Sequence, residues 1–202
     1  MKTVAIVAKG KNTCDTLKEQ LDRILGNRIR VVGHYVDDPL WTTIKADLIV
    51  ASGKTAYAAS AGKKPDCPII LARRTINYAG LDELFDLPPG TNILLVNDIF
   101  SAAEETISML QALGVDHLNY HPYAPNVANY PEWHMAVTPG EVGLVPPCVR
   151  TVINIKTRII DITTLTEILQ YFSMLDEKAS LISASYISNI IRLIKAGKQG
   201  NR

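Results

Sequence analysis

The sequence predicts an α/β fold in which parallel sheets are flanked by helices, and two observations support this class. Short β-rich runs alternate with helical patterns along the chain, which is typical of strand–helix–strand units. A Leu-Pro-Pro-Gly break at 87–90 then separates a first series of such units from a second. We therefore expect two Rossmann-like lobes with a cleft between them, and one continuous sheet is the alternative that this pattern leaves open.

The first lobe is expected over residues 1–88. Apolar, β-branched runs predict strands at 2–8, 29–36, 46–51 and 67–72. Helical spacing predicts a helix that Asn12 or Thr13 caps and that ends at Leu25, followed by helices at 56–61 and 81–85. The residues Asp37-Asp38-Pro39 are typical of a further helix start, with proline in the first turn.

The second lobe is expected over residues 89–172. Strands are predicted at 92–96, 117–120, 135–137 and 159–162, and the proline-rich segment 121–133 is predicted to be a loop. Ser101 and Glu104 form a predicted capping box for a helix to Leu113, and Thr163 or Thr164 is expected to cap a helix to Phe172. Residues 173–202 are expected to form a linker or dimerisation helix, because 176–196 has helical spacing.

Charge and cysteine content argue against several classes of function. The chain has 21 basic and 20 acidic residues, so it lacks the basic excess of nucleic-acid-binding proteins. It has no run of eighteen apolar residues and no signal-peptide pattern at its start, so we expect a cytoplasmic protein without a membrane span. Three cysteines without a CxxC pair, and four histidines without ligand spacing, predict no disulfide framework, no metal and no cofactor.

The turn Ser52-Gly53-Lys54-Thr55 is a candidate anion-binding site. It ends like a P-loop, but Leu48 stands where that motif needs its first glycine, so we expect no ATP hydrolysis. A helix N-terminus that follows a strand still presents free backbone N–H groups and a partial positive charge to a carboxylate or phosphate. The alternative is a polar helix cap with a solvated lysine.

Three further candidates follow other predicted strands. Arg73 follows the fourth strand, and guanidinium groups pair with carboxylates, although a surface charge is the alternative. Asn97 either faces the cleft or caps its turn, and Tyr123 belongs either to an aromatic ligand wall or to a proline-stiffened packing loop. Ligands of α/β sheets bind at the carboxyl ends of strands, so an anionic metabolite is expected to contact the turn 52–55 and at least one of these three residues.

A set of motifs, mostly in the second lobe, carries a family resemblance. The motifs are Leu94-Leu95-Val96-Asn97, Ala103-Glu104-Glu105-Thr106, Leu113-Gly114-Val115, His121-Pro122-Tyr123-Ala124-Pro125, Ala136-Val137-Thr138-Pro139-Gly140-Glu141, Val152-Ile153-Asn154-Ile155 and Arg158-Ile159-Ile160-Asp161-Ile162. They resemble the N-terminal sensory region of sigma-54-dependent transcriptional activators from Firmicutes. The resemblance covers most of residues 90–172, and in outline the chain is also similar to the sensory domain of propionate-catabolism regulators, which has two α/β lobes.

The resemblance implies a regulatory ligand-binding domain and not an enzyme. In such regulators an effector-bound sensory region signals to an AAA+ ATPase and a helix-turn-helix domain, and this chain contains neither Walker A nor GAFTGA motif. We therefore expect a fragment or a stand-alone sensor that does not itself bind DNA. Because such activators work as oligomers, the resemblance also implies a homodimer joined through the apolar stripe of the last helix: Leu181, Ile187, Ile190, Ile191 and Ile194.

Two other functions stay open. One is a cofactor-independent thiol racemase or isomerase, in which Cys14 and Cys148 would form the catalytic pair. The other is a pure dimerisation module whose cleft is empty and closed. Turnover that is lost on cysteine substitution would favour the first, and the absence of any ligand-induced stabilisation would favour the second.

Overall fold

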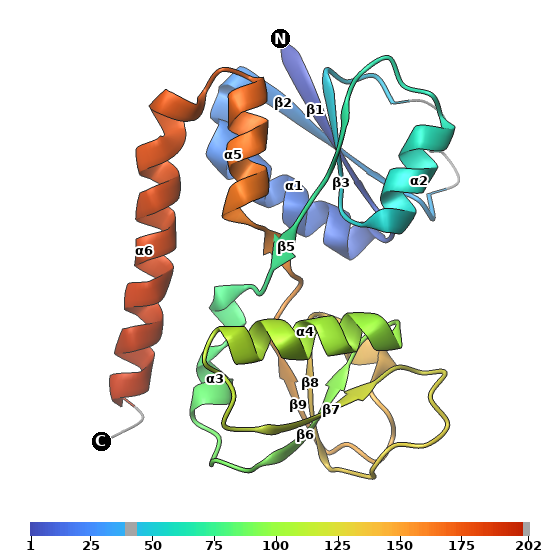
Figure 1. Cartoon of the computed structure of the whole chain (residues 1–202), viewed down its shortest axis with the longest axis vertical. Coiled ribbons are helices and arrows are strands. Elements are labelled where there is room, and N and C mark those ends of the chain that lie inside the picture. Colours follow the sequence, from blue (N-terminus) through green and yellow to red (C-terminus); the bar gives the residue numbers. More distant parts are fainter. Residues whose placement is uncertain (39–43, 200–202) are drawn as a thin grey trace. The chain divides into compact units, whose positions relative to one another are not determined.

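The computed structural model describes residues 1–38 and 44–199, with side chains described as far as Ile191. It contains two four-stranded parallel sheets flanked by helices, and a long C-terminal helix, which confirms the predicted fold class (Figure 1). The helix start predicted at Asp37-Asp38-Pro39 runs into residues that lie outside the described part of the chain.

The chain folds into two compact units whose boundaries differ from the expected ones. Unit 1 comprises residues 1–75 and 158–185, and unit 2 comprises 76–157 and 186–202. The break at 87–90 lies inside unit 2, because Ile76 and Leu84 on its N-terminal side pack in the core of that unit. Residues 158–172 belong to unit 1, because Leu165 and Ile168 pack in its core. The chain therefore passes between the units three times.

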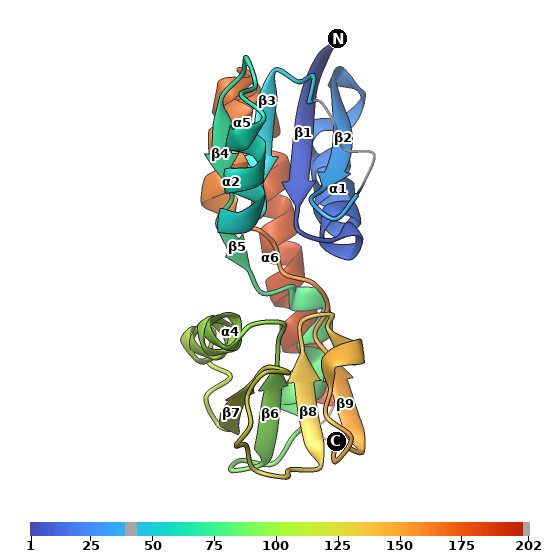
Figure 2. The same cartoon turned by 90° about the vertical axis from the view of Figure 1, so that its right-hand side faces the viewer.

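Sheet 1, in unit 1, has the strand order β2-β1-β3-β4, and all neighbouring strands are parallel (Figure 2). Its strands are β1 (Lys2–Ala8), β2 (Ile29–Tyr35), β3 (Leu48–Ala51) and β4 (Ile69–Leu71). Helices α1 (Lys11–Leu25) and α5 (Ile162–Tyr171) pack on one face, and α2 (Lys54–Gly62) packs on the other. This arrangement places the carboxyl ends of β1 and β3 side by side, where the chain continues to opposite faces.

The helix caps of unit 1 differ from the predicted ones. Helix α1 begins at Lys11 with Gly10 as its N-cap, because β1 ends at Ala8 and the connecting turn has only two residues. Helix α5 is capped by Asp161, whose Oδ1 accepts the Thr164 N–H at 2.8 Å. The strand before it, β10 (Ile159–Ile160), is shorter than predicted and pairs antiparallel with β5 (Arg74–Thr75).

Sheet 2, in unit 2, repeats the topology of sheet 1 with the order β7-β6-β8-β9, all parallel. Its strands are β6 (Asn92–Val96), β7 (Asn119–Tyr123), β8 (Met135–Thr138) and β9 (Thr151–Asn154). Helices α3 (Asp82–Phe85) and α4 (Phe100–Ala112) pack on one face. The other face is covered by side chains from the loops before and after β8, among them Tyr130, Trp133 and Leu144.

Three predictions in unit 2 are wrong in detail. Strand β7 continues to Tyr123 instead of ending at Tyr120, and it tolerates Pro122 because it is an edge strand. Helix α4 starts at Phe100 with Ile99 at the N-cap and no side-chain cap, so the predicted capping box of Ser101 does not form. The reason is that Ser101 already lies within the first helical turn. Strand β9 was not predicted at all.

The C-terminal helix α6 spans Leu175–Gln199, in agreement with the helical pattern. Ile182 is buried in the core of unit 1, and the Tyr186 ring meets the Tyr78 ring edge-on with their centres 6.0 Å apart. The residues of the predicted stripe whose side chains are described remain between 40% and 54% exposed: Leu181, Ile187, Ile190 and Ile191. The side chain of Ile194 lies outside the described part. Within that part, no helix is long and apolar enough to cross a membrane.

Candidate functional site

The turn 52–55 lies where sheet 1 ends and α2 begins. The Ser52 N–H donates to the Val7 carbonyl at 2.8 Å, so Ser52 sits beside the end of β1. Gly53 is the N-cap of α2 and supplies no side-chain acceptor, so the first N–H groups of the helix have no side-chain cap. Ser52 is only 5% exposed, whereas Lys54 and Thr55 are exposed. The predicted anion-binding turn therefore has open helix N–H groups and a cationic side chain.

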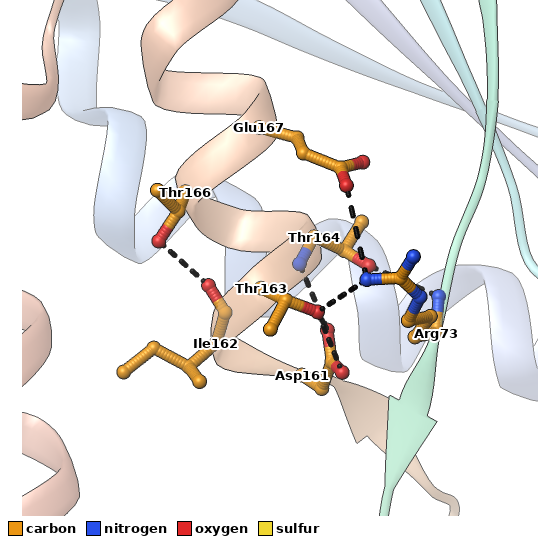
Figure 3. Close-up of polar contacts among 7 residues, drawn as sticks. All are labelled: Arg73, Asp161, Ile162, Thr163, Thr164, Thr166 and Glu167. Carbon is orange, nitrogen blue, oxygen red and sulfur yellow. Dashed lines mark hydrogen bonds and ion pairs between the residues drawn. The ribbon is translucent and has the colours of Figure 1, made fainter.

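Arg73 already has protein partners at the start of α5 (Figure 3). Its guanidinium donates to Thr163 Oγ1 at 3.2 Å and lies 3.9 Å from the Glu167 carboxylate, while its backbone N–H donates to Thr164 Oγ1 at 3.0 Å. Both charged side chains are largely exposed, so the ion pair contributes at most about 1 kcal/mol. These contacts connect Arg73 to α5, and its contact with a ligand stays a prediction.

Three polar side chains gather at the carboxyl edge of sheet 2. Tyr123 ends β7, Asn97 directly follows β6, and Thr138 ends β8, so they lie on three adjacent strands. The Asn97 N–H donates to the Tyr123 carbonyl at 3.0 Å. The three residues are 7%, 5% and 0% exposed, respectively. The structure thus brings the predicted residues Asn97 and Tyr123 together, and it adds Thr138.

The hydrogen bonds at this edge leave the side-chain amide of Asn97 open as a donor. Asn97 Oδ1 accepts the Asp98 N–H at 2.9 Å, and Thr138 Oγ1 accepts the Glu141 N–H at 2.9 Å. In the described residues the Asn97 Nδ2 group has no partner, yet it is not among the buried polar atoms sealed from solvent. Asn97 therefore offers a solvent-accessible donor on an otherwise buried side chain.

An aromatic group stands beside this edge. The Tyr123 and Tyr130 rings meet at 72° with centres 4.6 Å apart, and His121 and Trp133 meet at 75° with centres 5.8 Å apart. Tyr123 and its neighbours also form the core that covers the second face of sheet 2. The packing interpretation of the segment 121–125 is therefore supported, and the ligand wall stays a prediction.

Thr138 is the residue of this edge that sequence reasoning did not single out. A signal was present, because Thr138 directly follows the predicted strand 135–137.

The Cys14 thiol of the enzyme alternative is poorly suited to act as a nucleophile. Burial, with a smaller contribution from the Asp15 carboxylate, raises the pKa of the Cys14 thiol to about 11. A buried thiol of that pKa is almost entirely protonated near neutral pH and is a weak nucleophile. In the described residues, no cluster of three metal-ligating side chains occurs either.

Comparisons with known proteins assign no family to this chain. No protein-family model matches the chain, and no curated protein matches its sequence. Among solved structures, a solute-binding protein of an ABC transporter from Burkholderia multivorans is similar over 59% of this chain at 15% identity and a TM-score of 0.30. The match spans 58% of that protein. A likeness at this level carries no functional argument.

Proposed function

We propose that this chain is a sensory domain that binds a small metabolite, and that it serves a sigma-54-dependent transcriptional activator. The observation that carries the binding proposal is the edge of sheet 2, where Asn97, Tyr123 and Thr138 end three adjacent strands as buried polar groups. The Asn97 Nδ2 group has no partner in the described residues and is not sealed from solvent. A ligand that reaches this edge can therefore replace water as the acceptor of its hydrogen bond.

The position of these groups supports the same proposal. Open α/β sheets bind ligands outside the carboxyl ends of their strands, where neighbouring connections leave toward opposite sides. In sheet 2 this point lies between β6 and β8, which Asn97 and Thr138 follow or end. The regulatory half of the proposal rests on the motif resemblance of residues 90–172, and a ligand acts there only by favouring one conformation of the domain over another.

The binding proposal is tested by thermal unfolding of the 202-residue chain with a panel of small carboxylates, phosphates and neutral polyols. A ligand at one hundred times its Kd stabilises the native state by about 2.7 kcal/mol and raises Tm. The informative variant is Asn97→Asp, which keeps an oxygen acceptor for the Asp98 N–H but replaces the open amide donor with a carboxylate. The matched control is Asn126→Ala, an exposed residue of the loop after β7.

The wild type and the Asn126→Ala control should show the same ligand-induced increase in Tm, and Asn97→Asp should lose it. An increase that Asn97→Asp retains would overturn the site. Ligand-independent association with no Tm increase would support the dimerisation module instead. Racemase or isomerase turnover lost on Cys148→Ala would support the enzyme.

A test of the regulatory half of the proposal needs a measurable output activity. A chimera that joins this chain to an AAA+ module of a sigma-54 activator should change its ATPase rate when the stabilising ligand is added. The Asn97→Asp chimera should keep its basal rate and lose the response. An ATPase rate that the ligand does not change in the unsubstituted chimera would contradict the regulatory role. The binding result would still stand.

A further inference from the structure

The carboxyl edge of sheet 1 brings together the starts of two helices. Val7 of β1 and Ala51 of β3 are register partners, so the turns that follow these strands begin at the same level. The chain then enters α1 on one face of the sheet and α2 on the other. Gly10 and Gly53 directly precede these helices. They therefore lie on either side of the point where the connections after β1 and β3 diverge, and we call this point the gap.

Both helix starts are open. Neither Gly10 nor Gly53 provides a side-chain cap, and neither helix has an acidic residue in its first turn. A Cβ atom placed on either glycine would meet no atom within 4 Å, so there is space in front of each. Helix α5, which follows β10 outside sheet 1, is different because Asp161 caps it.

Ser52 is an independent indication of a ligand. It is only 5% exposed, and within the described residues its hydroxyl has no hydrogen-bond partner. The unpartnered atoms that are sealed from solvent there are Asp82 Oδ1 and His117 Nε2, so the Ser52 oxygen is not sealed from solvent. Val50 packs on the α1 face and Ala51 on the α2 face, so alternation directs Ser52 toward the α1 side of the gap.

Basic and acidic residues both lie near this gap. Lys54 has no ion-pair partner in the described residues, and Lys11 has only a 4.0 Å contact with Asp15. Asp37 and Asp38 follow β2, and the Asp37 N–H donates to the Lys9 carbonyl at 3.4 Å, so acidic residues approach the Gly10 turn from the β2 side. Each helix N-terminus adds roughly half a positive charge, so two helix starts with Lys54 beside them suit a doubly charged anion better than a single carboxylate.

We infer that a phosphoryl group, carried by a phosphate monoester or as free phosphate, binds between the starts of α1 and α2. Backbone N–H groups of both first turns and the Ser52 hydroxyl donate to its oxygens, and Lys54 balances its charge. This inference goes beyond the proposed function, because it assigns to unit 1 an anion site that is separate from the edge of sheet 2 and includes the Gly10 turn.

The test measures binding by isothermal titration at constant ionic strength, with inorganic phosphate, glycerol 3-phosphate and acetate as probes. The decisive variants are Gly10→Asp and Gly53→Asp, because an aspartate N-cap stabilises a helix while its carboxylate occupies the anion position. Both variants should unfold at the wild-type temperature or above it and lose phosphate binding. Gly62→Ala, at the far end of α2 and with no atom within 4 Å of the added Cβ, is the matched control.

Ser52→Ala should weaken binding about tenfold, the effect of one hydrogen bond to a charged group. Tighter binding of glycerol 3-phosphate than of phosphate identifies a monoester ligand, and equal affinities identify free phosphate as the recognised group. Acetate binding as tight as phosphate, or phosphate binding unchanged in Gly53→Asp, would overturn the inference. Asn97-dependent stabilisation by a ligand without a phosphoryl group, with no phosphate binding, would also overturn it while the proposed sensory function stands.

Discussion

Gly33 of β2 and the buried thiol of Cys14 allow a quantitative test of packing in unit 1. A Cβ atom on Gly33 would lie 2.7 Å from Cys14 Sγ, closer than real Cβ contacts, and 3.6 Å from Lys18 Cδ. Cys14 is 2% exposed and packs in the core of unit 1, so its sulfur has little room to move. Overpacking of this kind costs about 1–3 kcal/mol. Replacing a strand glycine by alanine returns about 0.5–1 kcal/mol.

Gly33→Ala should therefore lower the free energy of unfolding by up to about 2.5 kcal/mol. In a Cys14→Ala background the obstacle is gone, and the same substitution should be neutral or stabilise by up to about 1 kcal/mol. Urea unfolding followed by far-UV circular dichroism, in reductant at neutral pH, measures all four proteins of this cycle. Gly143→Ala, whose Cβ meets nothing within 4 Å, is the control. An equal loss of unfolding free energy in the wild-type and Cys14→Ala backgrounds would refute the conclusion that contact with the Cys14 sulfur causes the strain.

Three other expectations concern the α5 cap, alkaline pH and association. Asp161→Ala removes the acceptor for the Thr164 N–H and should cost about 1 kcal/mol in urea unfolding, unlike the exposed control Asp66→Ala. Burial raises the Cys14 pKa from 9.0 to about 11, so its contribution to stability is complete below pH 9 and is lost as pH rises to 11. The Tm of Cys14→Ala should therefore fall less over that range. The chain should sediment as a dimer and Ile187→Asp as a monomer; identical sedimentation would contradict the α6 interface.

The sequence pattern predicts the elements better than it predicts their ends. Periodicity located the strands from β1 to β4 because buried apolar runs are long compared with an error of one or two residues. The caps failed because they depend on where a strand ends. Gly10 and Ile99, and not the nearby Asn12 and Ser101, are the last extended residues before α1 and α4. The division into units was missed because the pairing of Thr75 with Ile159 joins residues far apart in the sequence.

Part of the candidate site was accessible from the same pattern. Ser52, Asn97 and Tyr123 were singled out because each follows a predicted strand, and parallel strands bring such residues to the carboxyl edge of their own sheet: sheet 1 for Ser52 and sheet 2 for Asn97 and Tyr123. The partners of Arg73 could not be predicted, because Thr163 and Glu167 are placed beside it only by the return of α5 to unit 1. The accessible oxygen of Ser52 likewise depends on packing that no local pattern records.

Unit 1 is built from two separate stretches of the chain, and this sets the order in which the two units can fold during synthesis. The core of unit 2 uses residues from Ile76 to Ile155, a single uninterrupted stretch, whereas the core of unit 1 also needs α5 and Ile182. Unit 2 can thus complete its core while unit 1 still waits for its last segment. Once unit 2 has folded, a hydrogen bond from Asn77 to the Thr157 carbonyl holds its two ends together. The intervening chain then acts as a short connector, so the pairing of β5 with β10 avoids most of the loop-closure entropy of the unfolded segment.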